Sequence, residues 1–322
     1  MPGWAIGFDI GGTKIAAGLV AEDGTLVTVR RARVDPSLEY ETVLHQIVDM
    51  VAALAQTASE PVEAVGIGLA GQIDPQKGFL HFSPNLRWHH RPVRDDLQQR
   101  IRYPVCVTND VRAVTWGEWL YGAGRGYRYV VCVFLGTGVG GSAVIDGQVR
   151  DGAFGMFGEI GHMPIEVDGR PCKCGMQGCL EAYVGGWAVA DQVRQDILEE
   201  PDAWRDLLVT DAIPDPVTPE WLAEQARKDH PRARYWVELL GHYLGVGMVG
   251  VVNVLNPECL ILGGGLLEGF PEWVGYVESA IRQWALPPAR RTRVVQAQLG
   301  INAGVIGAAA YARLCQPSPA SP

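Results

Sequence analysis

The chain has 322 residues, of which 48% are apolar and 20% are charged, and its formal net charge is −9. This composition is that of a globular protein, which excludes an intrinsically disordered or fibrous chain. At about 100–200 residues per domain, the length predicts two domains. An acidic chain without a block of Lys or Arg binds nucleic acids and anionic membranes poorly, so we expect neither as a partner.

The seven cysteines are an odd number, which excludes a complete disulfide framework. Cys172, Cys174 and Cys179 lie close together, and such clustering indicates a metal site more than disulfides. The first residues lack the basic and apolar segments of a signal peptide, so we expect a cytoplasmic protein. The uncharged stretch 239–257 is long enough to span a membrane, but glycines and polar residues interrupt it and favour a buried core helix.

Strands and helices alternate in the N-terminal half. Asp23-Gly24 lies between apolar runs and predicts a hairpin turn, because type I′ turns need positive φ. Hydrophobic periodicity predicts the other elements: strands at 5–10, 15–20, 25–29, 62–69 and 104–108, helices at 39–57, 95–102 and 110–120, and a loop over 70–90.

The first strand pattern recurs about 125 positions later. Strand 130–135, a glycine turn, strand 142–145, the turn Asp146-Gly147 and strand 148–150 repeat the N-terminal order. This repeat predicts two related domains. The alternation of strands and helices predicts an α/β fold with a largely parallel sheet. Downstream, the sequence predicts mostly helices, including a final helix at 304–314, with strands at 259–262 and 293–297. It predicts a disordered tail at 316–322, and the segment 199–234 matches no motif.

Two glycine turns have the composition of phosphate-binding sites. In Asp9–Lys14, Gly11 and Gly12 let backbone N–H groups approach a phosphate, Thr13 adds a hydroxyl, and Asp9 could hold Mg²⁺ through water. The second turn, 135–141, would be the partner of the first. Either turn alone is more often a simple hairpin, and neither is a Walker loop. A third cluster, Gly263–Gly265, follows a buried strand, where a base or ribose could lie; the alternative is a strand-to-helix turn.

Asn109-Asp110 stands where a strand ends and a helix begins. These residue types are common helix caps, which is the simpler interpretation. The same position also places a carboxylate at the end of a buried strand. There Asp110 could accept the proton of an attacking hydroxyl group.

The segment from Glu159 to Glu181 carries the most specific motif. His162 with Cys172, Cys174 and Cys179 forms a closed Cys₃His set, which suits a tetrahedral structural zinc and leaves no open position for catalysis. The metal would fix a loop that carries both carboxylates. Rigidly held carboxylates and an imidazole are well suited to bind vicinal hydroxyl groups of a sugar.

These motifs together resemble those of the ROK family (repressor, open reading frame, sugar kinase), over Ile6 to about Ala312. The resemblance implies the actin-like, ribonuclease-H-like ATPase fold, with two α/β domains flanking a cleft. A small domain would comprise 1–110 and 303–322, and a large domain 111–302. Relatives of this family also suggest a homodimer.

The resemblance implies a role for each motif. Asp110 would be the general base that acts on the 6-hydroxyl of a sugar, and His162 would bind both sugar and zinc through its two ring nitrogens. The remaining roles would be as follows: Asp9, Gly11, Gly12, Thr13 and Lys14 in the first phosphate motif; Gly136, Thr137, Gly138 and Gly140 in the second; Gly263, Gly264 and Gly265 near adenosine; Asn109, Glu159, His162 and Glu181 on the sugar; Cys172, Cys174 and Cys179 on zinc.

The expected function is ATP-dependent phosphorylation of a hexose in carbohydrate metabolism, with Mg²⁺ and structural Zn²⁺ as cofactors. Glucose is the first choice, converted to glucose 6-phosphate for glycolysis, and Phe157 is expected to crowd an N-acetyl group. An N-acetylhexosamine kinase and a non-catalytic sugar-sensing module are the alternatives. A sugar-sensing repressor is disfavoured, because only eight residues precede Asp9 and a helix-turn-helix does not fit there.

Overall fold

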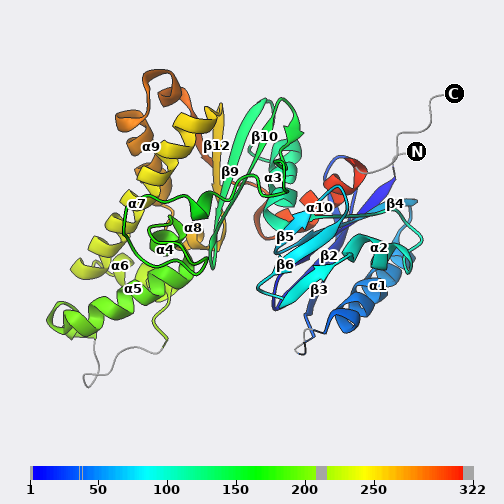
Figure 1. Cartoon of the computed structure of the whole chain (residues 1–322), viewed down its shortest axis with the longest axis horizontal. Helices are drawn as coiled ribbons and strands as arrows, with labels where there is room; N and C mark the ends of the chain where they lie inside the picture. The colour runs from blue at the N-terminus through cyan, green and yellow to red at the C-terminus, as the bar shows by residue number, and fades with distance from the viewer. Residues whose placement is uncertain (1–2, 36, 38, 208–215, 315–322) are drawn as a thin grey trace. The chain divides into compact units, whose positions relative to one another are not determined.

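The computed structural model describes residues 3–35, 37, 39–207 and 216–314. The chain divides into two compact units, each an α/β structure (Figure 1). Unit 1 comprises Met1–Arg128, Ser142–Phe157 and Gln298–Pro322, and unit 2 comprises Tyr129–Gly141 and Gly158–Ala297. The domain boundaries expected from the sequence, 1–110 with 303–322 and 111–302, stay a prediction. The tail 316–322 lies outside the described residues.

The sheet of unit 1 is mixed. Its strand order is β3-β2-β1-β4-β8. The first three strands along the chain pair antiparallel, because short turns join them, whereas β1, β4 and β8 are parallel, so that their carboxyl ends meet at one edge. The strands are β1 (Trp4–Ile10), β2 (Lys14–Val20), β3 (Leu26–Arg33), β4 (Val62–Leu69) and β8 (Val105–Asn109).

Side chains alternate between the two faces of this sheet. Ile6, Phe8 and Ile10 join the core that contains the apolar face of α1 (Tyr40–Thr57). The opposite face is covered by α10 (Ala303–Leu314), which also packs against α3 (Asp110–Tyr121). At Gly7 an added Cβ would collide with the backbone of α10, so this helix approaches the sheet closely. Asp9 lies on the same face as Gly7 and therefore near the start of α10.

The prediction of a loop over 70–90 is wrong. Three short strands form an antiparallel sheet there, in the order β5-β6-β7: β5 (Gln72–Asp74), β6 (Phe79–Ser83) and β7 (Trp88–Arg91). The helix α2 (Val93–Gln98) follows. Strands this short give almost no alternation to detect, and the glycines and prolines of the turns dominate the sequence.

The second five-stranded sheet repeats the order of the first one. Its strands run β11-β10-β9-β12-β13, with β9, β12 and β13 parallel, and the division between the units falls within β10. This matching order confirms the internal repeat. Asp146 (φ 55°) and Gly147 (φ 71°) form the predicted two-residue turn with positive φ. The strands are β9 (Tyr129–Leu135), β10 (Val139–Ile145), β11 (Gln148–Val149), β12 (Cys259–Gly263) and β13 (Arg293–Gln296).

The rest of unit 2 is mainly helical. The helices are α4 (Glu181–Val184), α5 (Gly186–Glu199), α6 (Pro219–Arg227), α7 (Pro231–Leu255), α8 (Gly265–Gly269) and α9 (Trp273–Trp284). Among the described residues, α7 is the one helix long and apolar enough to cross a membrane, and half of its most apolar window is buried inside the structure. It packs against α6 and α9, as predicted for a core helix.

A buried carboxylate anchors the segment that matched no motif. Asp196 in α5 accepts hydrogen bonds from the indole nitrogens of Trp204 and Trp236, both at 2.8 Å, and from Arg232. Burial opposes its ionisation, but these hydrogen bonds outweigh burial and lower the pKa of Asp196. The chain on both sides of the undescribed residues 208–215 is thus tied to α5.

Replacing Asp196 with Ala should lower the free energy of unfolding by about 3 kcal/mol, because two buried indole N–H groups and Arg232 lose their acceptor. Urea denaturation of the two proteins measures the difference. The same loss should develop in the wild type on acidification, as the pH falls below the ordinary Asp pKa and through the lowered one. Asp202→Ala removes only an exposed ion pair with Arg205 and should change stability by less than about 0.5 kcal/mol. Equal effects of the two substitutions would contradict this account.

Candidate functional site

Two carboxyl groups lie close together at the strand ends of unit 1. Asp9 is near the end of β1, and Asp110 begins α3 directly after β8. Between them runs β4, where Gly68 pairs with both Asp9 and Thr108. Burial, and then the negative charge of Asp110, raise the pKa of Asp9 to about 6. Burial also raises the pKa of Asp110.

Asn109 alone provides the cap of α3. Its Oδ1 accepts a hydrogen bond from the backbone N–H of Arg112 at 3.1 Å, and its Nδ2 donates to the carbonyl of Gly71 at 3.1 Å. The carboxylate of Asp110 accepts from the N–H of Val111 at 2.9 Å. The simpler interpretation of this motif therefore applies to Asn109, and Asp110 is not needed as the cap.

The first glycine turn is closely packed against its neighbours. The N–H of Gly11 donates to the carbonyl of Lys14 at 3.0 Å, which closes the turn between β1 and β2. An added Cβ on Gly12 would lie 2.8 Å from the carbonyl oxygen of Asn85. Thr13 and Lys14 are exposed. The predicted phosphate-binding groups are thus at the surface of unit 1, on a turn whose backbone is fixed.

Asp9 also contacts the beginning of α10. An added Cβ on Gly304 would lie 2.5 Å from Cγ of Asp9, so only glycine leaves room for the carboxyl group there. The amino-terminal end of a helix carries a partial positive charge, which favours an anion beside it.

In unit 2, the second glycine turn is fastened to the start of α5. The carbonyls of Gly136 and Thr137 accept hydrogen bonds from the N–H groups of Gly186 at 2.9 Å and Trp187 at 3.2 Å. Within the turn, the N–H of Gly136 donates to the carbonyl of Gly138 at 2.9 Å. Thr137 is exposed, whereas Gly140 already belongs to β10.

Glu181 is directed at this same turn. Its Oε2 accepts from the N–H of Val139 at 2.9 Å, and its Oε1 accepts from the indole N–H of Trp187 at 3.3 Å. Both carboxylate oxygens thus have a protein donor, although each keeps a further lone pair. Its role as a sugar ligand stays a prediction. Glu159, the other predicted carboxylate of unit 2, is exposed.

The predicted metal ligands converge. The ligand atoms of His162, Cys172, Cys174 and Cys179 all lie within 4.8 Å of one another. The sulfur atoms of Cys174 and Cys179 are 3.7 Å apart, and Nδ1 of His162 is 3.7 Å from the sulfur of Cys172. A tetrahedral zinc with Zn–S bonds of about 2.3 Å needs sulfur atoms about 3.8 Å apart, so the set fits this metal. Because Nδ1 faces the cluster, Nε2 of His162 is the nitrogen left for another ligand.

The third glycine cluster forms a strand-to-helix turn between β12 and α8. Gly264 has φ 96°, and an added Cβ there would collide with the carbonyl of Leu135. An added Cβ on Gly265 would meet nothing within 4 Å. The structure thus agrees with the alternative interpretation, a strand-to-helix turn. That Gly263–Gly265 lie near adenosine stays a prediction.

A buried arginine near Asp110 was not singled out in the sequence. Arg112 is 3% exposed, its Nε lies 3.0 Å from Oδ1 of Asp151, and it donates to the carbonyl of Gly155 at 3.0 Å. It therefore ties α3 to the loop that leads along the chain to Glu159. The one available signal was a charged residue among the apolar residues of the predicted helix.

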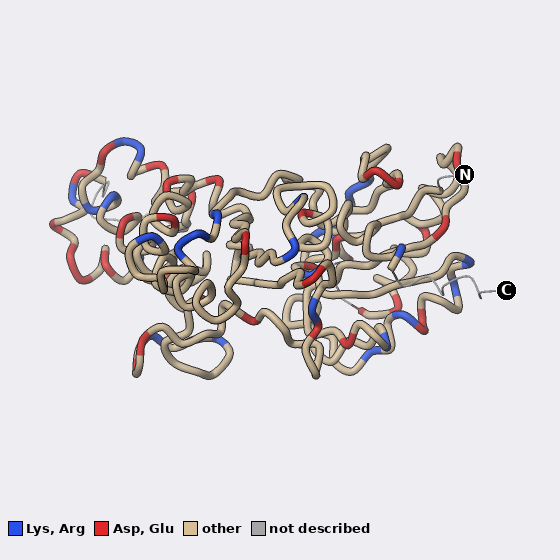
Figure 2. Tube along the Cα trace, turned by 90° about the horizontal axis from the view of Figure 1, so that it is seen from above, with Lys and Arg blue, Asp and Glu red and all other residues tan. Residues whose placement is uncertain are grey.

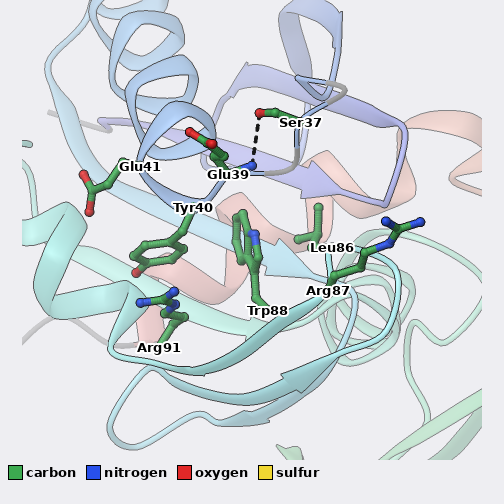
Figure 3. A pocket seen from close by; sticks show the side chains of 8 residues that line it. All are labelled: Ser37, Glu39, Tyr40, Glu41, Leu86, Arg87, Trp88 and Arg91. Carbon is green, nitrogen blue, oxygen red and sulfur yellow. Dashed lines mark hydrogen bonds between the residues drawn. The ribbon is translucent and has the colours of Figure 1, made fainter.

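A pocket of about 430 Å³ lies in unit 1 between the start of α1 and β7 (Figure 3). The guanidinium of Arg91 lies 4.8 Å from the ring centre of Tyr40, whose hydroxyl donates to Asp96 at 2.7 Å. None of the predicted site residues lines this pocket.

Lys and Arg positions are interspersed with Asp and Glu positions along the chain (Figure 2).

Replacing Asp110 with Asn should lower the pKa of Asp9 from about 6, because the neighbouring negative charge is lost. The pKa should stay above its ordinary value, because burial remains. Carboxyl ¹³C NMR titration without divalent cations measures it, and Asp9→Asn assigns the signal. Because the folded state binds this proton more tightly, Asp9 should reduce stability as the pH rises from about 4 to about 6. An unchanged pKa of Asp9 in Asp110→Asn would contradict the proximity of the two groups.

Metal analysis by mass spectrometry should find one zinc ion per chain in the purified protein. Cys179→Ser should lose most of it, because a hydroxyl group is a poor replacement for a thiolate ligand. Cys106→Ser serves as the control, since that buried thiol bonds to the carbonyl of Ala312 and lies outside the cluster. Full zinc content in Cys179→Ser would show that the cluster is not the metal site.

The family model described as ROK family matches residues 5–314. A glucokinase of Streptomyces coelicolor is 35% identical over 322 residues, which covers 98% of this chain and 99% of that protein. A glucokinase of Thermotoga maritima is 33% identical, covering 94% and 95%. The crystal structure of a ROK family glucokinase from Streptomyces griseus in complex with glucose and AMPPNP is 36% identical, with a TM-score of 0.82 over 97% of this chain and 100% of that one. The chain therefore belongs to the ROK family and has the actin-like ATPase fold that its sequence predicts.

Proposed function

We propose that the protein is a glucokinase, which transfers the γ-phosphoryl group of ATP to the 6-hydroxyl of glucose. The observation that carries the proposal is the end-to-end match with a ROK glucokinase whose crystal structure contains glucose and AMPPNP, at 36% identity. The paired carboxyl groups Asp9 and Asp110 support it, because clustered carboxyl groups with raised pKa values are typical of catalytic sites.

Asp110 is the general base of the proposed reaction. It accepts the proton of the 6-hydroxyl group while that oxygen attacks the γ-phosphorus and the bond from phosphorus to the oxygen of ADP breaks. The raised pKa of Asp110 suits this task, because a base is most effective when its pKa is closer to the working pH.

The glycine turns provide the charge compensation on which phosphoryl transfer depends. Backbone N–H groups of Gly12 and Thr13, and of Thr137 and Gly138, would bind the phosphates, because those of Gly11 and Gly136 close their own turns. Asp9 would hold Mg²⁺ through water. When bound, Mg²⁺ neutralises charge on the phosphate oxygens. Phosphoryl transfer needs little covalent work from the protein beyond this positioning.

Asn109, Glu159 and Nε2 of His162 are the proposed ligands of the other sugar hydroxyls. His162 can serve both sites because its Nδ1 faces the metal cluster. Zinc would fix the loop that carries Glu159 and His162. We also propose a cytoplasmic location, from the absence of signal-peptide features in the sequence, and a homodimer, which the resemblance to the ROK family implies.

Discrimination between glucose and an N-acetylhexosamine rests on Phe157. Its backbone N–H donates to the carbonyl of Asp151 at 3.1 Å, so the residue belongs to the loop that Arg112 holds. A large side chain in this loop favours a sugar without an N-acetyl group. The second candidate is a kinase for N-acetylglucosamine or N-acetylmannosamine. The substrate test below distinguishes it from a glucokinase.

Sugar-dependent ADP release from Mg²⁺-ATP should be fastest with glucose in a panel that includes mannose, fructose, N-acetylglucosamine and N-acetylmannosamine. Asp110→Asn should reduce kcat by about 10²- to 10⁴-fold, because it removes the general base. Asp95→Asn, at an exposed position in α2, should leave it unchanged. Turnover only on an N-acetylhexosamine would overturn the choice of sugar. Binding of sugars without any turnover would favour a sensor over a kinase.

A further inference from the structure

A buried arginine joins the start of α3 to the loop 151–157. The side chain of Arg112 is 3% exposed, and its Nε lies 3.0 Å from Oδ1 of Asp151. Its Nη2 donates a hydrogen bond to the carbonyl of Gly155 at 3.0 Å, and its Nη1 donates to the hydroxyl of Thr108 at 3.3 Å. One guanidinium group therefore connects the loop with the end of β8.

The same arginine is linked to a predicted sugar ligand. Its backbone N–H donates to Oδ1 of Asn109 at 3.1 Å, and Nδ2 of Asn109 donates in turn to the carbonyl of Gly71, directly before β5. An added Cβ on Gly155 would lie 2.6 Å from the carbonyl oxygen of Ile73 in β5. The strand end, β5 and the loop thus form one connected set of contacts around Arg112.

The loop 151–157 is closed on itself. The N–H of Phe157 donates to the carbonyl of Asp151 at 3.1 Å. Gly152 has φ 71°, and an added Cβ there would lie 3.3 Å from Cβ of Phe157, so Phe157 packs against this glycine. Because its two ends are bonded to each other, we expect the loop to shift as one piece. The position of Asp151 then determines that of Phe157.

The ion pair of Arg112 and Asp151 favours one position of this loop. Burial raises the pKa of Asp151, the charge of Arg112 lowers it, and the charge of Asp74 adds to the rise. In the described part of the chain, Asp151 is the acidic group in an ion pair with Arg112. A loop displaced from α3 would leave the arginine buried without a counter-ion, which is strongly unfavourable.

We propose that Arg112 and Asp151 are positioning residues for sugar selectivity: their ion pair holds the loop 151–157, and with it Phe157, in the conformation that disfavours an N-acetyl group. The inference rests on the proposed function, in which Phe157 crowds such a group. Loss of the ion pair releases the loop. N-acetylhexosamines then bind better relative to glucose.

The ratio of the Ki of N-acetylglucosamine, as a competitor of glucose, to the KM for glucose tests the proposal. Asp151→Asn keeps the shape of the side chain but removes its charge, and the ratio should fall about 3- to 10-fold, a part of the discrimination that one pocket contact provides. Arg112→Lys loses the planar fork that reaches both Asp151 and Gly155, and should act in the same direction. Asp146→Asn is the matched control, because it removes only the exposed ion pair with Arg128 and should leave the ratio unchanged.

A second substitution separates positioning from a merely structural role. Phe157→Ala should also lower the ratio, and Asp151→Asn should add no further fall in that background, because both act through the same side chain. A loss of stability lowers the amount of active enzyme but changes neither Ki nor KM. An unchanged ratio in Asp151→Asn, or an equal fall with and without Phe157, would overturn the inference alone. Absence of glucose turnover in the wild type would overturn the proposed function, and the inference with it.

Discussion

The candidate site of unit 1 depends on holding two carboxyl groups close together at the ends of parallel strands. Burial, and then the negative charge of Asp110, disfavour ionisation of Asp9 and raise its pKa to about 6, and burial also raises the pKa of Asp110. The absence of a side chain at Gly304 leaves room for Asp9, because an added Cβ there would lie 2.5 Å from Cγ of Asp9. The arrangement reduces stability near neutral pH, a cost that binding sites commonly carry.

Unit 2 solves a different problem, which is to hold an exposed turn still. The β9–β10 turn has no apolar core of its own, and its glycines are intrinsically flexible. Hydrogen bonds from Gly186 and Trp187, and the carboxylate of Glu181, fix it from both sides. A metal bound to the Cys₃His set would then stabilise the loop from which Glu181 comes. In unit 1, burial and charge determine the properties of the site residues. In unit 2, hydrogen bonds determine the conformation of the turn.

Local patterns predicted most of the fold. The strand β4 and the start of α3 coincide with the sequence prediction, because hydrophobic periodicity and turn residues determine them locally. The small sheet within 70–90 was missed because strands of three to five residues carry too little pattern. The Cys₃His cluster was predictable because its ligands are close in sequence. The contact of Glu181 with Val139 and that of Arg112 with Asp151 were not, because tertiary packing alone brings such distant residues together.

A crystal structure of the protein with glucose and Mg²⁺-AMPPNP tests the central claim most directly. The account predicts a carboxylate oxygen of Asp110 within about 2.6–3.2 Å of the 6-hydroxyl oxygen of glucose. It also predicts phosphate oxygens on the N–H groups of both glycine turns. A sugar whose 6-hydroxyl faces another base, or an Asp110 that contacts only protein atoms, would contradict it.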